Sequence, residues 1–389
     1  MQKENRCITV AIDARIPDTG LGGVQQVIRS LATGFSELES SNLKRVWIVY
    51  RDTNWWQGVF PPDDQIIQLE APLGGIALTL SRKSPRIVSF LYPIFRLVRP
   101  EKSFLDETLR SYSVDIVHLP FQDGIHTELP TIYHPHDLQH IYLPQNFNWF
   151  QRHHRNTIWK HQAERARIVM AASLSVEQDL QQIWNIDPLK IRVIPIPPPN
   201  RASGFSQPSS LVSKPYILFP SVFWKHKNHE TLIRAVHHLV NRGEHVTCVF
   251  SGAKGPTLKR CQKLVRKLSL DTYIKFVGHT PDADFGALIN HSSCVVVPSL
   301  FEAASLTVWD AQKAGIPVAC SDIPVFRNQL ADTASYFDPH DSVAIANTIS
   351  RVLGDTAYKD QIVKNAYQRI SGLTSRQFAE SMINLYRSI

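Results

Sequence analysis

The segment from Cys294 to Gly315 constrains the fold of this chain more than any other stretch. It opens with one Cys and three Val residues, a run typical of a buried parallel strand, and Pro298 ends that run. A helix that stops at Gly315 is then predicted from apolar residues at helical spacing, namely Leu306, Trp309, Ala311 and Ala314. Because strand, short loop and helix follow one another here, the segment predicts an α/β fold.

Two acidic residues flank the start of this predicted helix. Glu302 opens the loop and Asp310 follows eight positions later, which is about 12 Å along a helix. Free N–H groups and the helix dipole at a helix start attract phosphate. Carboxylates so placed are able to hold hydroxyl groups at the two ends of a nucleotide sugar, with the diphosphate between them. The alternative is a strand-helix joint with two solvated acids.

This stretch resembles the acidic signature of the retaining glycosyltransferases of family 4. The residues that match that signature are Glu302, Leu306, Asp310, Ala311 and Gly315. The loop residues Ala303, Ala304 and Ser305 replace the Gly-Phe-Gly usually found there. The resemblance implies a GT-B architecture, with two Rossmann-like doubly wound domains facing a central cleft. It also implies that amides near Ser305 and Leu306 bind the donor diphosphate, while Glu302 contacts the sugar and Asp310 the ribose.

The length of 389 residues is that of two domains, each large enough for its own core. A proline-rich run at 194–200 predicts a stiff crossing between them. We expect an acceptor-side domain over 1–200 and a nucleotide-sugar-binding domain over 201–370. In the family the last helix, here within 371–389, crosses back to the first domain.

The first domain is predicted to open with a strand over 8–14, a glycine-rich loop and a helix over 25–35. A dinucleotide-binding fingerprint would need a third glycine where Gln25 stands, so a dehydrogenase is disfavoured. In family 4 the corresponding glycines let backbone amides approach the donor, a role that the resemblance assigns to Gly22 and Gly23. An ordinary tight turn is the alternative.

A strand then leads into a loop with three histidines, His134, His136 and His140. The segment resembles the family's His-Asp-Leu motif, in which the histidine before the aspartate contacts the donor sugar near the reaction centre. That residue is His136, and Asp137 holds the loop. Zinc binding by the histidines is an alternative, disfavoured because no Cys or carboxylate lies nearby at metal-ligand spacing.

The second domain contains a run around Lys227 that resembles the family's Lys-Asn-His segment, whose Lys binds the donor diphosphate. Many members carry an Arg six residues earlier, where Ser221 stands here; Lys225 is our candidate to replace it. Two further strand-to-loop joints place Gly252 and His279 at the carboxyl ends of strands, where doubly wound sheets bind ligands. His136, Lys227 and Glu302 are thus the predicted catalytic residues.

Two basic segments do not belong to these motifs. Residues 81–102 interleave cations with large apolar side chains, which predicts docking on an anionic membrane through Arg96, Arg99 and Lys102. The predicted helix over 150–167 carries Arg155 and other cations, and would dock a phosphate-bearing lipid acceptor. A core helix and a solvated helix face are the respective alternatives.

The net charge of +8 is consistent with an anionic partner. The five cysteines are scattered without a CxxC pair, so we expect reduced core thiols and no metal. The amino terminus shows no apolar signal-peptide core and no run approaches a membrane span, so we expect a cytoplasmic protein, peripheral on the inner face of the cell membrane. No cofactor is expected beyond the nucleotide-sugar substrate.

The function predicted from these residues and the resemblance is transfer of a hexose, with retention, to a saccharide or polyprenyl-phosphate-linked acceptor in envelope polysaccharide synthesis. The chain also resembles the cyanobacterial heterocyst envelope polysaccharide glucosyltransferases, which implies UDP-glucose as donor. A GDP-mannose donor, a GT-B sugar-nucleotide epimerase and a non-catalytic nucleotide-sugar-binding protein are alternatives. Nucleic-acid binding is disfavoured because no RNA-recognition, zinc-finger or helix-turn-helix pattern is present.

Overall fold

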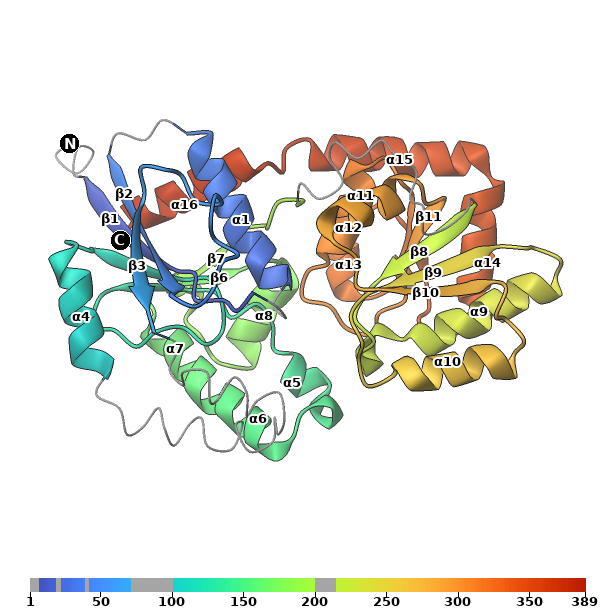
Figure 1. Ribbon diagram of the computed structural model, residues 1–389, viewed down its shortest axis with the longest axis horizontal. Coiled ribbons are helices and arrows are strands. Elements are labelled where there is room, and N and C mark those ends of the chain that lie inside the picture. The colour runs from blue at the N-terminus through green and yellow to red at the C-terminus, as the bar shows by residue number, and fades with distance from the viewer. Residues whose placement is uncertain (1–6, 19–21, 39–41, 71–100, 200–214) are drawn as a thin grey trace. The chain divides into compact units, whose positions relative to one another are not determined.

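The computed structural model describes residues 7–18, 22–38, 42–70, 101–199 and 215–389. The chain divides into two compact units, of which the first comprises Met1–Ile196 with Ser375–Ile389 and the second Pro197–Thr374. The division between Ile196 and Pro197 falls inside the proline-rich run, where fixed backbone dihedrals limit how the chain turns. Each unit contains a parallel sheet with helices on its faces (Figure 1).

The first unit is built on a seven-stranded parallel sheet of order β3-β2-β1-β4-β5-β6-β7. Its strands are β1 (Ile8–Asp13), β2 (Leu43–Tyr50), β3 (Gln65–Leu69), β4 (Ile116–Leu119), β5 (Thr131–Tyr133), β6 (Ile168–Ala171) and β7 (Ile191–Val193). The helices described here are α1 (Gly22–Ser36), α4 (Glu101–Ser111), α5 (Gln139–Tyr142), α6 (Trp149–His154), α7 (Lys160–Arg165), α8 (Leu174–Gln182) and α16 (Ser375–Arg387). Short 3₁₀ turns cover Pro144–Asn146 and Pro188–Lys190.

The second unit is built on a six-stranded parallel sheet of order β10-β9-β8-β11-β12-β13. Its strands are β8 (Tyr216–Pro220), β9 (Thr247–Ser251), β10 (Ile274–Gly278), β11 (Cys294–Val297), β12 (Val318–Ser321) and β13 (Ser335–Phe337). Its helices are the 3₁₀ turn η4 (Lys225–Lys227), α9 (His229–Asn241), α10 (Leu258–Lys267), α11 (Asp282–Asn290), α12 (Leu306–Lys313), α13 (Pro324–Leu330), α14 (Ser342–Gly354) and α15 (Thr356–Ile370).

Both sheets reverse their strand order beside the first strand of the unit, at β1/β4 and at β8/β11. Ligands of doubly wound sheets bind outside the carboxyl ends of the strands near such a switch point. Strand β11 is fully buried, as its β-branched run predicted. The predicted architecture of two Rossmann-like α/β domains is confirmed.

The last helix, α16, belongs to the first unit and lies against α1 (Figure 1). Gly34 of α1 makes this approach feasible, because a Cβ at that position would stand 2.0 Å from the carbonyl oxygen of Ser375. Inside the unit, the Tyr386 hydroxyl forms a 2.9 Å hydrogen bond with Nδ1 of His118 on β4, and both side chains are buried. The carboxyl-terminal residues therefore complete the core of the first unit.

Two helices differ from the sequence predictions. Helix α1 begins at Gly22, so Gly22 and Gly23 form its first turn rather than a loop before it. The helix predicted over 150–167 is interrupted by a π-helical turn, Arg155–Trp159, between α6 and α7. One extra residue in that turn shifts the side chains of α7 around the axis relative to those of α6, which residue periodicity alone does not reveal.

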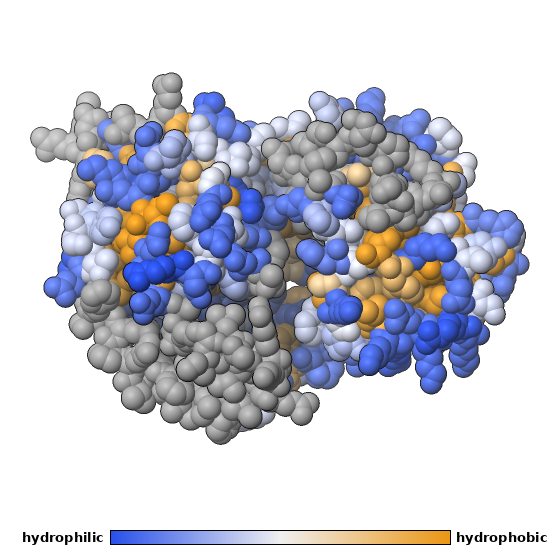
Figure 2. Space-filling model, viewed as in Figure 1, coloured by the Kyte–Doolittle hydropathy of each residue, from blue (hydrophilic) through white to orange (hydrophobic). Residues whose placement is uncertain are grey.

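Part of the excess positive charge lies on α10, whose sequence carries two Arg and three Lys. Figure 2 shows this helix as a hydrophilic edge of the second unit. Cys261 and Val265 face the core from the same helix, so these cations form the solvated face of an amphipathic element. The overall charge is therefore not concentrated at the predicted site alone.

Candidate active site

In the second unit, three strand ends are joined by backbone hydrogen bonds. The Ser221 amide after β8 donates to the Ser251 carbonyl at 2.7 Å, and the Gly252 amide after β9 donates to the Gly278 carbonyl at 2.7 Å. Gly252 has no room for a side chain, because a Cβ would stand 2.1 Å from the Ser221 carbonyl oxygen. The predicted donor-side residues Ser221 and Gly252 therefore lie in contact. His279, directly after β10, is exposed.

Lys227 is held at the start of α9 by its neighbour Asn228. Asn228 adopts a left-handed conformation with φ of 60°, which Asn tolerates better than most residues. Its side-chain Nδ2 donates to the carbonyl oxygens of Pro298, at 3.0 Å, and Pro339, at 2.8 Å. The Leu300 amide also donates to the His226 carbonyl at 2.7 Å. The loops after β8, β11 and β13 are thereby fixed around Lys227.

The side chains of Lys227 and Glu302, 75 residues apart in the chain, form an ion pair. The Lys227 Nζ lies 2.6 Å from Glu302 Oε1, and the side chains are 21% and 9% exposed. An ion pair removed this far from water carries a desolvation cost that the mutual attraction must offset. Two residues predicted separately as catalytic are thus neighbours at the carboxyl ends of β8 and β11.

The loop that replaces the family's glycines is held by Gln329 of α13. Its side-chain amide accepts from the Ser305 N–H at 3.1 Å and donates to the Ser305 carbonyl at 3.0 Å. Ser305 has φ of −105° and ψ of 107°, an extended conformation open to any residue, so no glycine is required there. Because the Ser305 N–H is engaged, anion binding at this helix start falls to the amides from Leu306 onward.

The remaining loop residues and Asp310 differ in exposure. Ala303, Ala304 and Leu306 are half-buried, whereas Asp310, inside α12, is completely buried at 0% exposure. A buried carboxylate needs a compensating partner. The role of Asp310 at the ribose stays a prediction.

Two histidines beside Lys227 are held neutral. Burial, followed by the charge of Lys227, lowers the pKa of His226 to about 4. The same causes in the same order lower the pKa of His229 to about 3, and its ring stacks on Phe223 at 4.2 Å between centroids. Lys227 therefore supplies the positive charge next to Glu302, whereas Lys225, at the start of η4, is exposed.

In the first unit, His136 follows β5 in a left-handed conformation with φ of 62°. Its Nε2 donates to the Pro120 carbonyl at 2.8 Å, and its ring lies 3.9 Å from that of His134. Burial is the main cause that lowers the pKa of both rings. The histidine loop is therefore uncharged at neutral pH. Gly23, in the first turn of α1, has open space where a Cβ would stand.

Arg155, predicted to face a membrane or acceptor, is enclosed by aromatic rings. Its guanidinium carbon lies 4.3 Å from the centroid of Phe147 and 4.2 Å from that of Trp159. Burial lowers its pKa, which nearby carboxylates partly offset. This cation–π stacking points to a role in holding the α6–α7 segment together.

The other predicted membrane residues are not described by the structure. Arg96 and Arg99 lie outside the described residues, and so does the side chain of Lys102 in α4. In the described part of the chain, no helix is long and apolar enough to cross a membrane. The same residues include no group of three or more His, Cys, Asp or Glu side chains able to hold a metal ion.

Two family models match the chain, and each covers most of one unit. Residues 205–369 match glycosyl transferases group 1, and residues 21–197 match glycosyltransferase family 4. The chain belongs to the family 4 glycosyltransferases. The models meet close to the division between the two units.

Individual relatives of this glycosyltransferase are distant. The O-antigen chain mannosyltransferase RfbU of Salmonella typhimurium is 24% identical over 250 residues, which are 63% of this chain and 68% of RfbU. The O-antigen chain mannosyltransferase B of Escherichia coli is 24% identical over 36% of each chain. The aligned part is thus little more than a third of the latter relative.

Solved structures match over nearly the whole glycosyltransferase. Anabaena Alr3699/HepE, in complex with UDP and glucose, superposes with a TM-score of 0.72 at 16% identity, over 98% of this chain and 100% of that one. Sucrose-phosphate synthase from Thermosynechococcus elongatus gives a TM-score of 0.72 at 19% identity, with 98% of each chain covered. These likenesses establish the GT-B fold.

Sequence reasoning missed the residues that position this glycosyltransferase's site. Asn228 lies inside the quoted Lys-Asn-His segment, and an Asn next to a helix start was a usable signal for a left-handed turn. Gln329 gave no signal, because it lies 24 residues from Ser305 on a different helix. Lys227 and Glu302 are brought together in the second unit, while His136, Gly22 and Gly23 belong to the first.

Proposed function

We propose that this glycosyltransferase moves a hexose from a nucleoside diphosphate sugar to an acceptor hydroxyl, with Lys227 and Glu302 at the reacting centre. The observation that carries the proposal is the 2.6 Å ion pair between these side chains beside the first turn of α12. A cation, a carboxylate and helix amides at one sheet edge suit a ligand with a diphosphate and sugar hydroxyls.

Lys227 acts on the leaving group. As the bond between the sugar and the diphosphate breaks, negative charge develops on the phosphate oxygen, and a preorganised cation stabilises it. Lys227 uses one of its three N–H groups for Glu302, which leaves two to donate to phosphate oxygens. The amides of α12 from Leu306 onward face the same charge.

Glu302 orients the sugar rather than attacking it. Its Oε1 accepts from Lys227, and its second oxygen is available to accept from a sugar hydroxyl. In the retaining reaction that the resemblance implies, the acceptor oxygen bonds to the anomeric carbon as the phosphate bond breaks on the same face. The acceptor's proton passes to the leaving phosphate oxygen. His136 contacts the sugar in this scheme, and Asp310 the ribose.

UDP-glucose is the donor that we favour. The Anabaena structures similar to this chain are described as complexes with UDP and with UDP-glucose, which supports that choice. GDP-mannose is the second candidate, because RfbU is named a mannosyltransferase. The acceptor is a saccharide or a polyprenyl-phosphate-linked saccharide of an envelope polysaccharide, reached from the cytoplasmic face of an anionic membrane.

Thermal unfolding with UDP, GDP and ADP tests the donor site. A ligand present at 100 times its dissociation constant stabilises the native state by about 2.7 kcal/mol. We expect UDP to raise Tm most, and UDP-glucose to release UDP in an acceptor-dependent assay. A larger shift with GDP, and turnover of GDP-mannose, would establish the second candidate. No shift with any nucleoside diphosphate would overturn the assigned site.

A further inference from the structure

A pocket separate from the Lys227–Glu302 site opens in the first unit, between α5 and α6. Its volume is about 380 Å³, and it is lined chiefly by His140, Ile141, Trp149, Arg152, His153 and Asn156. This size lies at the lower end of the range of about 300–1,000 Å³ that is typical of small-molecule sites. None of the predicted site residues that the structure describes lines it, so its chemistry has to be read from these side chains.

Trp149 presents a flat aromatic surface at this pocket. Its side chain is 68% exposed, although large aromatic side chains are normally well buried. The indole stacks on His153 with 6° between ring planes and 5.2 Å between centroids. A reciprocal capping box between Asn148 and Gln151 fixes the turn on which it stands. A flat, supported ring of this kind suits the C–H face of a pyranose.

His140 adds a buried hydrogen-bond acceptor. It is 1% exposed, and its Nε2 donates to Asn156 Oδ1 at 2.9 Å, so Nδ1 carries a lone pair. Burial is the main cause that lowers the pKa of His140, so the ring stays neutral. No described residue bonds to this Nδ1. Buried polar atoms normally have a partner, and a sugar hydroxyl is able to donate to this one.

Arg152 gives the pocket its charge. Arg152 belongs to the lining, and its buried Nε has no hydrogen-bond partner among the described residues. Among the described residues, no carboxylate lines the pocket to neutralise this charge. An arginine in such surroundings binds a carboxylate or phosphate oxygen with more than one N–H. The preferred ligand is therefore anionic as well as ring-shaped.

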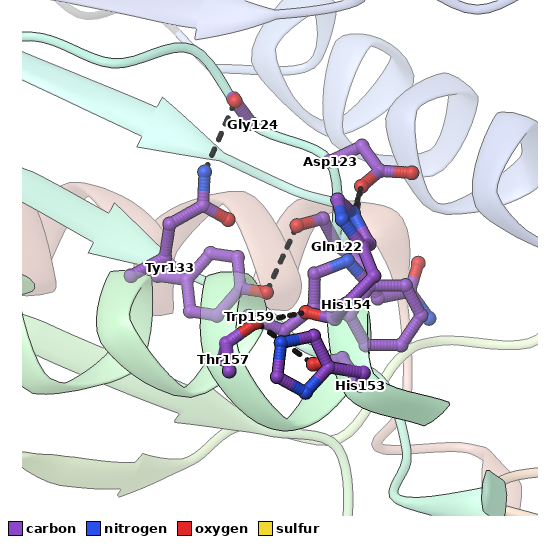
Figure 3. Close-up of polar contacts among 9 residues, drawn as sticks. Gln122, Asp123, Gly124, Tyr133, His153, His154, Thr157 and Trp159 are labelled. Carbon is purple, nitrogen blue, oxygen red and sulfur yellow. Dashed lines mark hydrogen bonds and ion pairs between the residues drawn. The ribbon is translucent and has the colours of Figure 1, made fainter. Parts of the chain in front are cut away.

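The wall that carries these residues is anchored to the loop after β4 (Figure 3). Asp123 Oδ1 accepts from Trp159 Nε1 at 2.9 Å and from His154 Nε2 at 3.3 Å. Gln162 Nε2 donates to the Gly124 carbonyl at 3.1 Å, and Thr157 Oγ1 donates to the His153 carbonyl at 2.7 Å. The π-helical turn lies within this anchored segment, and such turns are frequent at functional sites.

We propose that this pocket binds a pyranose ring that carries an anionic group, with the ring on Trp149, a hydroxyl on His140 and the anion on Arg152. The assignment of this pocket as a subsite for the acceptor rests on the proposed transferase function. The binding of the sugar to the pocket does not depend on that function. A membrane surface is a poorer fit, because the lining includes the buried His140 and the cation of Arg152 beside its apolar surface, and because Trp149 stacks on His153.

Saturation-transfer NMR on the full chain, without donor, tests the binding. The probes are methyl glucuronide, glucose 1-phosphate and neutral methyl glucoside. We expect both anionic sugars to bind, and the neutral sugar to bind about tenfold more weakly because it lacks the charge-assisted contact. Trp149→Ala should remove the saturation-transfer signals of the sugar-ring protons. Arg152→Gln should lower the affinity for the anionic sugars to that for the neutral sugar.

Matched controls separate the pocket from general effects. Tyr367→Ala replaces an aromatic side chain that is 71% exposed in the second unit, and Arg110→Gln replaces an exposed arginine on α4; neither should change sugar binding. Equal binding of neutral and anionic sugars, or binding that survives Trp149→Ala, would overturn the proposal.

A vesicle assay tests the competing ligand class. Anionic phosphatidylglycerol vesicles that bind through Trp149, in the absence of any sugar binding, would show a lipid contact and overturn the sugar subsite. Stabilisation by UDP in the same preparations reports on the donor site alone, so failure of one assignment is distinguishable from failure of the other.

Discussion

The candidate site loops of the two units differ in their electrostatics, because one carries an ion pair and the other carries neutral side chains. In the second unit, Lys227 and Glu302 form a charged pair of low exposure, joined to neighbouring loops by Asn228. In the first unit, the rings of His134 and His136 lie 3.9 Å apart, and burial lowers the pKa of both, so they are neutral. One site is organised around a charge, and the other around buried neutral rings.

This difference assigns different tasks to the two loops. A preorganised charge stabilises the charge that develops on a leaving diphosphate, which is the costly part of glycosyl transfer from a nucleotide sugar. In the proposed scheme, His136 is a neutral histidine beside the sugar, which donates or accepts a hydrogen bond without adding positive charge to an electron-poor anomeric carbon. The predictions below test this division of roles.

The largest effect is expected for Lys227→Ala. Turnover of the donor should fall about a hundredfold, because a charge-assisted contact to the leaving group contributes about 1.5–3 kcal/mol. Initial rates at saturating donor measure it, with exposed Lys267→Ala on α10 as the control. Normal turnover by the folded Lys227→Ala variant would remove Lys227 from the mechanism.

The pH dependence of stability tests whether burial, with the charge of Lys227, holds His229 neutral. The pKa of His229 is about 3 in the folded chain, below the ordinary value of 6.5, so between these values only the unfolded chain binds the proton. This contribution to stability is complete above pH 6.5 and is lost as the pH falls, by about 1.4 kcal/mol per pH unit.

His229→Phe keeps a ring against Phe223 and removes this proton linkage. Urea unfolding at pH 7, 6 and 5 should therefore show a flatter decline than in the unaltered protein. Exposed His161→Gln should leave the slope as it was. An unchanged slope in His229→Phe would mean that its ring is not held neutral by its surroundings.

Gln329→Leu tests whether the loop before α12 depends on side-chain support. It leaves the N–H and carbonyl of Ser305 buried without the partner they have now, which costs about 1–3 kcal/mol. Chemical denaturation measures the loss, with exposed Gln368→Leu as the matched control. Stability equal to that of the control would show that the clamp is dispensable.

His136→Ala probes the neutral loop of the first unit. We expect turnover to fall by at most about tenfold, because a neutral hydrogen bond contributes about 0.5–1.5 kcal/mol. His136→Asn should be the more stable variant, since Asn accepts the left-handed conformation better than Ala. A drop as large as that of Lys227→Ala would break the proposed contrast between the units.

The smallest effect is expected for Asp310→Asn. The apparent KM for the donor should rise roughly fivefold while kcat changes little, because a ribose contact is felt equally in the ground and transition states. Steady-state kinetics measure both constants. A fall in kcat with an unchanged KM would assign Asp310 to the reacting centre instead.

Local patterns predicted the elements well where the spacing of apolar residues agreed with the Pro and Gly residues that end strands and helices. The β-branched run at 294–297 marked β11, and Gly315 marked the end of the helix region that follows it. The prediction failed where the backbone departs from a regular period. Nothing in residues 150–167 revealed the π-helical turn, whose segment forms hydrogen bonds from Trp159 and Gln162 to the loop after β4, more than 30 residues earlier in the chain.

By itself the sequence determined the α/β class of fold, because this depends on short-range patterns of apolar spacing, proline and glycine. Its resemblance to the family implied the two Rossmann-like domains and the candidacy of Lys227 and Glu302. The tertiary structure alone decided that these two side chains pair, that Gln329 engages the Ser305 amide and that Asn228 joins the loops after β11 and β13. Each of those contacts joins segments on different strands or helices. Their geometry follows from strand order and helix packing, which no local pattern of residues specifies.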